Sequence, residues 1–118
     1  MKKTIALLLL GLFAFAAESA EKMPLPMPKN ARLIDVRTPE EFKTGALPGA
    51  VNIPHDQAGV KVPQLVKDKK TPLYLYCRSG RRVQSAMKVL KEKGYTVIWN
   101  LGGLEEAGKK LKLRPVTK

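Results

Sequence analysis

The hydrophobic pattern divides the chain into a short apolar start and a longer segment of mixed polarity. Lys2 and Lys3 precede thirteen residues without a polar side chain, Ile5–Ala17. A positive start followed by a short apolar run is typical of a secretory signal peptide, and a permanent membrane-spanning helix needs about 20 apolar residues. We therefore predict export of a soluble periplasmic protein without a stable membrane anchor. Cleavage is expected after Ala16 or after Ala20, which ends a signal segment of twenty residues.

A proline-rich stretch follows over residues 21–30. Its prolines stand at alternate positions, Pro24, Pro26 and Pro28. Proline lacks a backbone N–H group, so this spacing blocks both a helix and a central strand. We predict an extended lead-in that tethers a single domain over residues 31–118, and this domain ends in a basic tail.

Short apolar runs in the domain predict strands. Most of them are rich in β-branched or aromatic residues and lie next to Pro, Gly or Asn, which is typical of buried strands. The expected strands are Arg32–Val36, Ala50–Ile53, Leu73–Tyr76 and Thr96–Trp99.

The first expected helix begins with a capping motif. Thr38 can cap the helix, Pro39 fits its first position, and Glu41 stands three residues after the cap. This combination is typical of a helix start, so a short helix through Phe42 is expected.

Helical patterns also separate the later strands. The longest follows Gly80 and stops at Gly94, with apolar residues at intervals of three and four. One or two short helices are expected within His55–Lys70, and a last one over Leu104–Leu111. Alternating strands and helices predict an α/β fold with a mainly parallel sheet of four to five strands flanked by helices.

Charge and cysteine content narrow the chemistry. The 118 residues include 22 Lys and Arg against 10 Asp and Glu, and the net charge of +12 favours anionic partners. Cys77 is the only cysteine and His55 the only histidine, which excludes an internal disulfide and a multicysteine zinc site. We expect no metal and no organic cofactor, and His55 is expected to be a loop residue without a chemical role.

The loop after Cys77 is the strongest candidate for a functional site. Cys77 directly follows the expected strand Leu73–Tyr76, and Arg78-Ser79-Gly80-Arg81-Arg82 then leads into a helix. In parallel sheets, ligands bind beyond the carboxyl ends of the strands. Loop N–H groups, the helix dipole and the arginines all favour an anion here, so we predict a nucleophilic thiolate. Three arginines cannot all face one sulfur atom, so a solvent-exposed position is as well supported for Arg81 as a position facing the sulfur.

Four motifs occur in a fixed order between Arg32 and Gly108. They are Asp35-Val36-Arg37 with Glu41-Phe42, Gly45-Ala46-Leu47-Pro48-Gly49-Ala50-Val51-Asn52-Ile53-Pro54, Tyr76-Cys77-Arg78-Ser79-Gly80-Arg81-Arg82, and Gly102-Gly103. With these motifs the chain resembles the rhodanese family, in particular its small exported single-domain members of the phage-shock-protein-E type. The resemblance implies a rhodanese-like fold.

The same resemblance implies sulfur transfer. The family's catalytic cysteine, matched by Cys77, takes the sulfane sulfur of thiosulfate, releases sulfite and holds a persulfide. A thiophilic acceptor, cyanide or a thiol, then removes that sulfur, and no cofactor is needed. The substrate-binding residues would come from the loop, whose amides cradle the persulfide and whose Arg78 and Arg82 bind the sulfonate oxygens: Arg78, Ser79, Gly80, Arg81 and Arg82.

Three residues outside the loop are expected to support it. Asp35 and Arg37 lie at the carboxyl end of the first strand, on the side of the site, and a structural ion pair is favoured over a catalytic role. Trp99 could form a wall of the pocket, although an aromatic residue in a strand more often packs in the core.

Two other functions compete with an enzyme of this kind. A persulfide or polysulfide carrier that does not turn over would need the same cysteine and loop. A cysteine phosphatase or arsenate reductase is a distant alternative, because the phosphatase loop has Arg six positions after Cys and this chain has Val83 there. Nucleic-acid binding is disfavoured, since the chain lacks an aromatic and basic platform and export is expected. The oligomeric state is left open.

Overall fold

The computed structural model describes residues 22–117. The expected signal segment and both cleavage positions, Ala16 and Ala20, lie outside the described residues, so export stays a prediction. Within residues 22–117, none of the helices combines the length and the apolar content that crossing a bilayer requires.

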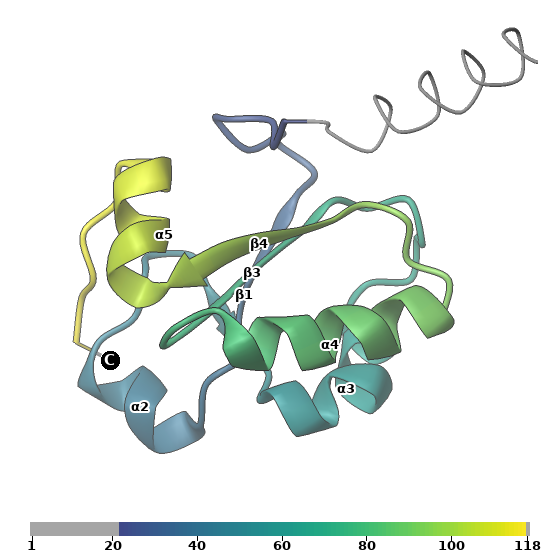
Figure 1. Cartoon of the computed structure of the whole chain (residues 1–118), viewed down its shortest axis with the longest axis horizontal. Coiled ribbons are helices and arrows are strands. Elements are labelled where there is room, and N and C mark those ends of the chain that lie inside the picture. Colours follow the sequence, from purple (N-terminus) through teal and green to yellow (C-terminus); the bar gives the residue numbers. More distant parts are fainter. Residues whose placement is uncertain (1–21, 118) are drawn as a thin grey trace, which may run out of the picture.

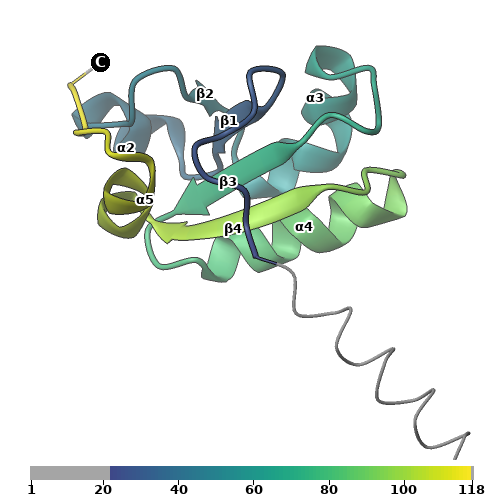
Figure 2. The ribbon, with the colours of Figure 1, turned by 90° about the horizontal axis from the view of Figure 1, so that it is seen from above.

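Four parallel strands form one sheet, so the α/β prediction is confirmed. The strands are β1 (Arg32–Asp35), β2 (Val51–Asn52), β3 (Leu73–Cys77) and β4 (Ile98–Gly103). Their order across the sheet is β2-β1-β3-β4, and every neighbouring pair is parallel. Strand β3 therefore lies in the interior of the sheet, between β1 and β4, as Figures 1 and 2 show.

Helices cover both faces of this sheet. They are α2 (Pro39–Thr44), the 3₁₀ turn η1 (His55–Gln57), α3 (Ala58–Leu65), α4 (Arg81–Glu92) and α5 (Leu104–Leu111). Figure 1 shows α3 and α4 together on one side of the sheet and α5 on the other. The capping box at the start of α2 is present, with Thr38 as the cap and Glu41 as its partner, and α5 has the predicted bounds.

Two apolar clusters fill the space between the sheet and these helices. Side chains of a strand alternate between faces, and β3 shows this directly. Leu73, Leu75 and Cys77 join the cluster under α3 and α4. Tyr74 and Tyr76 join the cluster on the α5 side. All five are completely buried, so the central strand is apolar on both faces, as expected for a parallel sheet.

The last strand differs from its prediction. It was expected over Thr96–Trp99, but β4 begins at Ile98 and continues to Gly103. Gly102 and Gly103 were thus expected beyond the strand, whereas Gly103 pairs with Cys77. A Cβ atom at Gly103 would collide with the carbonyl oxygen of Arg78, so close approach of two chain segments explains this glycine.

The lead-in contains neither helix nor strand over residues 22–30. It is nevertheless not a free tether, because Met23 and Met27 pack against the cluster on the α5 side. The hydroxyl of Tyr74 also donates a hydrogen bond to the carbonyl of Pro24 at 2.6 Å. Apolar residues alternate with the prolines in this stretch, and they hold it on the sheet.

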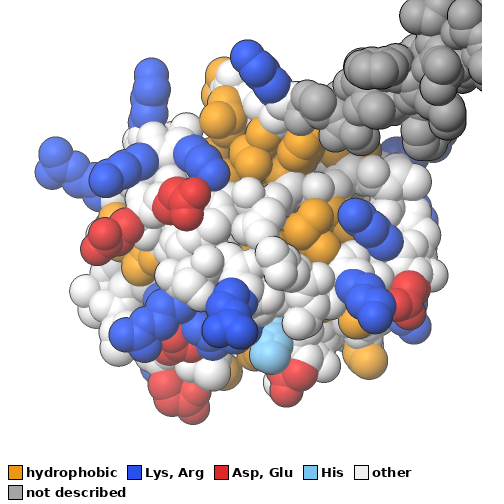
Figure 3. All heavy atoms as spheres, in the orientation of Figure 1, with side chains coloured by type: hydrophobic (Ala, Val, Ile, Leu, Met, Phe, Trp, Pro, Cys, Tyr) orange, Lys and Arg blue, Asp and Glu red, His pale blue; other side chains and the backbone are white. Residues whose placement is uncertain are grey.

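The basic side chains do not gather into one patch on the face shown in Figure 3. Lys and Arg are spread over this face, and Asp and Glu lie among them.

Candidate functional site

Cys77 is the last residue of β3, at the edge where the carboxyl ends of the strands meet. Its side chain is completely buried. Residues 78–80 form a tight loop, and α4 begins directly afterwards at Arg81. The sulfur therefore lies next to the positive end of a twelve-residue helix.

The backbone of the loop supplies a hydrogen bond to the sulfur. The N–H of Gly80 donates to Sγ of Cys77 over 2.9 Å. Gly80 has a φ of 90°, in the left-handed region that side chains disfavour, and it is the N-cap of α4. Glycine thus allows the chain to turn back over the sulfur.

Asn100 holds the loop against β4, and sequence reasoning missed this residue. Its amide nitrogen donates to the carbonyl of Gly80 at 3.2 Å, and its amide oxygen accepts from the N–H of Gly102 at 2.8 Å. The available signal was a polar side chain inside an otherwise apolar strand, between Trp99 and Leu101. Asn100 therefore joins the loop after β3 to the neighbouring strand.

Arg82 is engaged by a carboxylate, which the sequence did not predict. Its two terminal nitrogens lie 2.7 and 3.0 Å from the two oxygens of Glu41. The hydrogen bond from Arg82 is the main cause that lowers the pKa of Glu41 to about 2, against the opposing effect of burial, and Thr38 adds further hydrogen bonds. In this structure the guanidinium group of Arg82, with its fork of two terminal nitrogens, therefore binds an internal anion, the Glu41 carboxylate.

Arg78 and Arg81 differ from Arg82 in this respect. Both are exposed, and neither forms an ion pair with any residue in 22–117. Ser79, which follows Arg78, is exposed as well, whereas Gly80 is buried. Three of the five loop residues are thus exposed, namely Arg78, Ser79 and Arg81. Gly80 is buried, and Arg82 is paired with Glu41.

The ion pair expected between Asp35 and Arg37 is present. The side chains are 0% and 5% exposed, and Nη2 of Arg37 lies 2.7 Å from Oδ2 of Asp35. The same nitrogen donates to the carbonyl of Gly45 at 2.6 Å, so the pair ties the segment after β1 to the end of α2. Burial acts to lower the pKa of Arg37, but the hydrogen bond and charge of Asp35 outweigh it and raise the pKa. These contacts fit a structural role.

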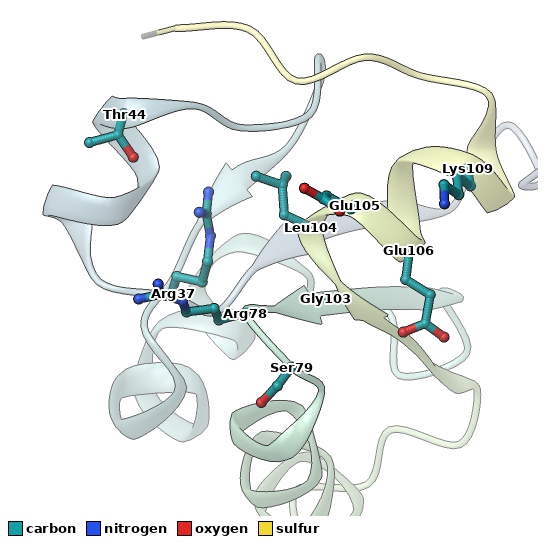
Figure 4. Close-up of a pocket in the computed structure, with 9 residues that line it drawn as sticks. All are labelled: Arg37, Thr44, Arg78, Ser79, Gly103, Leu104, Glu105, Glu106 and Lys109. Atoms are coloured by element: carbon teal, nitrogen blue, oxygen red, sulfur yellow. The ribbon is translucent and has the colours of Figure 1, made fainter.

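An open hollow of about 670 Å³ lies beside the loop, and Figure 4 shows it. Arg37 and Arg78 lie on one side of Gly103, Glu106 lies on the other, and Ser79 lies below. Cys77 does not line the hollow, since its side chain is buried beneath the loop. The hollow beside the loop is therefore lined mainly by polar residues and carries charges of both signs.

Trp99 and His55 lie away from this hollow. Trp99 packs against the cluster on the α5 side, in line with the core position that was favoured for it. Its Nε1 is buried and has no hydrogen-bond partner among the described residues. His55 was expected in a loop, but it begins the turn η1 and borders a separate hollow between α3 and α4. No group of three metal-ligating side chains occurs in the part of the chain that the structure describes.

Comparison with known proteins assigns the family. Residues 17–110 match the rhodanese-like domain, and this chain therefore belongs to the rhodanese-like sulfurtransferase family. It is 37% identical over 82 residues to the thiosulfate sulfurtransferase PspE of Escherichia coli, covering 70% of this chain and 79% of that protein. A solved structure described as a rhodanese with anions from E. coli superposes with a TM-score of 0.66 at 34% identity, covering 75% of this chain and 99% of that one.

Two Bacillus subtilis proteins widen the range of relatives. The uncharacterized protein YqhL is 41% identical over 87 residues, covering 73% of this chain and 68% of its own. The putative sulfur carrier protein YrkF is 28% identical over 82 residues, covering 70% of this chain and 43% of its own. The family is therefore clear, and its members carry names that describe more than one role.

Proposed function

We propose that the protein is a thiosulfate sulfurtransferase that works through a persulfide on Cys77. The thiolate of Cys77 attacks the sulfane sulfur of thiosulfate, the S–S bond of thiosulfate breaks, and sulfite leaves with the bonding electron pair. Cyanide or a thiol then attacks the outer sulfur of the persulfide, and the Cys77 thiolate is regenerated. Each half of this cycle balances without a cofactor.

One observation carries the proposal: the Gly80 N–H donates to the Cys77 sulfur at the start of α4. Loop amides and a helix N-terminus favour negative charge, both on the thiolate and on the persulfide that replaces it. Arg78 is exposed, has no ion-pair partner among residues 22–117, and borders the hollow. We assign it to the sulfonate oxygens, with Ser79 and Arg81 beside it.

The test is thiocyanate formation from thiosulfate and cyanide. The chain is expected to turn over many times, and Cys77→Ser is expected to give no thiocyanate above background, because the hydroxyl is a far weaker nucleophile at neutral pH. Circular dichroism of both proteins controls for folding. Activity retained by a folded Cys77→Ser variant would exclude the persulfide route.

A sulfur carrier is the second candidate, and the similarity to YrkF favours it. A carrier would accept one sulfur from a donor and keep it until a protein partner takes it. The two functions separate by counting sulfite: repeated release per Cys77 supports the enzyme, and a single stoichiometric burst supports the carrier. A phosphatase is disfavoured, because Val83 is completely buried where an arginine would be needed.

A further inference from the structure

Glu41 is the residue outside the loop with the strongest contact to the loop's charges. Its carboxylate receives both terminal nitrogens of Arg82, at 2.7 and 3.0 Å. Bidentate pairs of this kind are among the stronger hydrogen-bonded contacts of proteins. The side chains are 24% exposed for Glu41 and 29% for Arg82, so the pair is only partly screened by water.

The carboxylate is held in place from its own helix as well. The N–H and the hydroxyl of Thr38 both donate to Oε1 of Glu41, each at 3.1 Å. Glu41 in turn donates its backbone N–H to the Thr38 hydroxyl at 3.2 Å. The pKa of about 2 keeps Glu41 ionised at neutral pH. Glu41 therefore presents a negative charge to Arg82, and the hydrogen bonds from Thr38 hold that charge in place.

Arg82 also lies close to the sulfur along the chain. It stands in the first turn of α4, two residues after Gly80, whose N–H donates to Sγ of Cys77. The Glu41 hydrogen bond is the main cause that raises the pKa of Arg82, against the opposing effect of burial, and the charges of Glu41 and Cys77 add smaller contributions. An anion bound at Cys77 is therefore within reach of the field of Arg82. While Glu41 occupies the fork, most of that positive charge is neutralised.

We infer that Glu41 is an internal competitor for the oxyanion site, a positioning residue that sets how tightly the loop binds thiosulfate and releases sulfite. This inference rests on the proposed function. A substrate oxyanion gains the Arg82 fork only when Glu41 gives it up, so Glu41 weakens anion binding. When sulfite forms, return of Glu41 to Arg82 favours its departure.

The direct test is Glu41→Gln, which keeps the size of the side chain and removes its charge. The KM for thiosulfate is expected to fall about three- to fivefold, the upper end of the range for losing one competing, partly exposed ion pair. Product inhibition by sulfite is expected to tighten by a similar factor. A KM and a sulfite inhibition that both stay the same, or that both weaken, would overturn the inference.

Two variants separate competition from a general effect of charge or shape. Glu40→Gln removes the same charge from the neighbouring, exposed position on α2 and is expected to leave the KM within twofold. In an Arg82→Gln background, Glu41→Gln should change the KM by less than twofold, because the contested fork is gone. An equal effect with and without Arg82 would show that Glu41 acts by another route.

Sulfate binding provides a readout that needs no turnover. Sulfate is an unreactive tetrahedral oxyanion, and its binding can be followed by the amide chemical shifts of residues 78–82. The half-saturating concentration is expected to fall about three- to fivefold in Glu41→Gln. If the wild type makes no thiocyanate, the proposed function fails while this titration still decides the role of Glu41.

A second variant, Glu41→Asp, keeps the test decisive if Glu41→Gln does not fold. Glu41→Asp keeps a negative charge in the first turn of α2 but shortens the reach to Arg82. It is expected to lower the half-saturating sulfate concentration in the same direction by a smaller factor. Circular dichroism identifies the folded variants, and an unchanged sulfate titration in whichever variant folds contradicts the inference.

Discussion

Strands β1 and β3 are neighbours that end at the same edge of the sheet, yet their ends are built differently. Strand β1 ends at Asp35, and Arg37 follows two residues later, so that the two side chains neutralise each other in the interior. Strand β3 ends at Cys77, and the loop that follows has two exposed arginines without an ion-pair partner within residues 22–117. One end has its charges satisfied internally, and the other leaves cations available to a ligand.

The difference shows what each end contributes. A buried ion pair costs desolvation and serves to hold chain segments together, so the end of β1 forms a frame for the site. Loop amides and exposed arginines retain their capacity to bind anions, so the end of β3 is suited to chemistry. Glu41 connects the two, because it belongs to the helix after β1 and binds Arg82 after β3.

The largest expected effect is at the end of β1. Asp35→Ala leaves the Arg37 guanidinium buried without its carboxylate, which costs about 3–5 kcal/mol of folding free energy. Urea unfolding of the two proteins measures this loss. Cys77→Ser, at the end of β3, is the matched comparison and should cost less than half as much. Equal losses at the two ends would mean that the distinction between frame and site is wrong.

A smaller effect is expected for the exposed arginines of the loop. Arg78→Ala removes a charge-assisted contact to the sulfonate oxygens, so the KM for thiosulfate should rise about tenfold, with little change in the free energy of unfolding. Arg81→Ala removes the same charge from the next exposed arginine and is expected to change the KM less. Steady-state kinetics with cyanide as the acceptor measure both, and a larger effect at Arg81 would reverse the assignment.

The smallest effect concerns the pair that links the two strand ends. The pKa of Glu41 is lowered from 4.5 to about 2, so the folded state gains stability above pH 4.5 and loses it as the pH falls towards 2. Because the pair is partly exposed, we expect the wild type to lose only about 1 kcal/mol more than Glu41→Gln over this interval. Urea unfolding at several acidic pH values gives, for each of the two proteins, the slope of the free energy of unfolding against pH. Parallel slopes would show that the pair does not stabilise the fold.

Much of the fold could be predicted because local patterns agree with tertiary packing. Helix α5 has the predicted bounds Leu104–Leu111, and the capping box at Thr38 is formed as expected. The errors occur where long-range contacts override local preference. The last strand was expected to stop at Trp99, but β4 continues through Gly103, where the lack of a side chain allows the loop after Cys77 to approach.

The sequence by itself determined where the proposed nucleophile stands and which residues follow it. A lone cysteine at the end of a buried strand, followed by a glycine-containing basic loop and a helix, is a local arrangement, and local geometry follows from adjacent residues. The partners of the arginines were decided only by the tertiary structure. Glu41 and Arg82 are 41 positions apart, and the parallel order of β1 and β3 brings their following helices together. Which cation is neutralised and which remains available to a substrate depends on that packing.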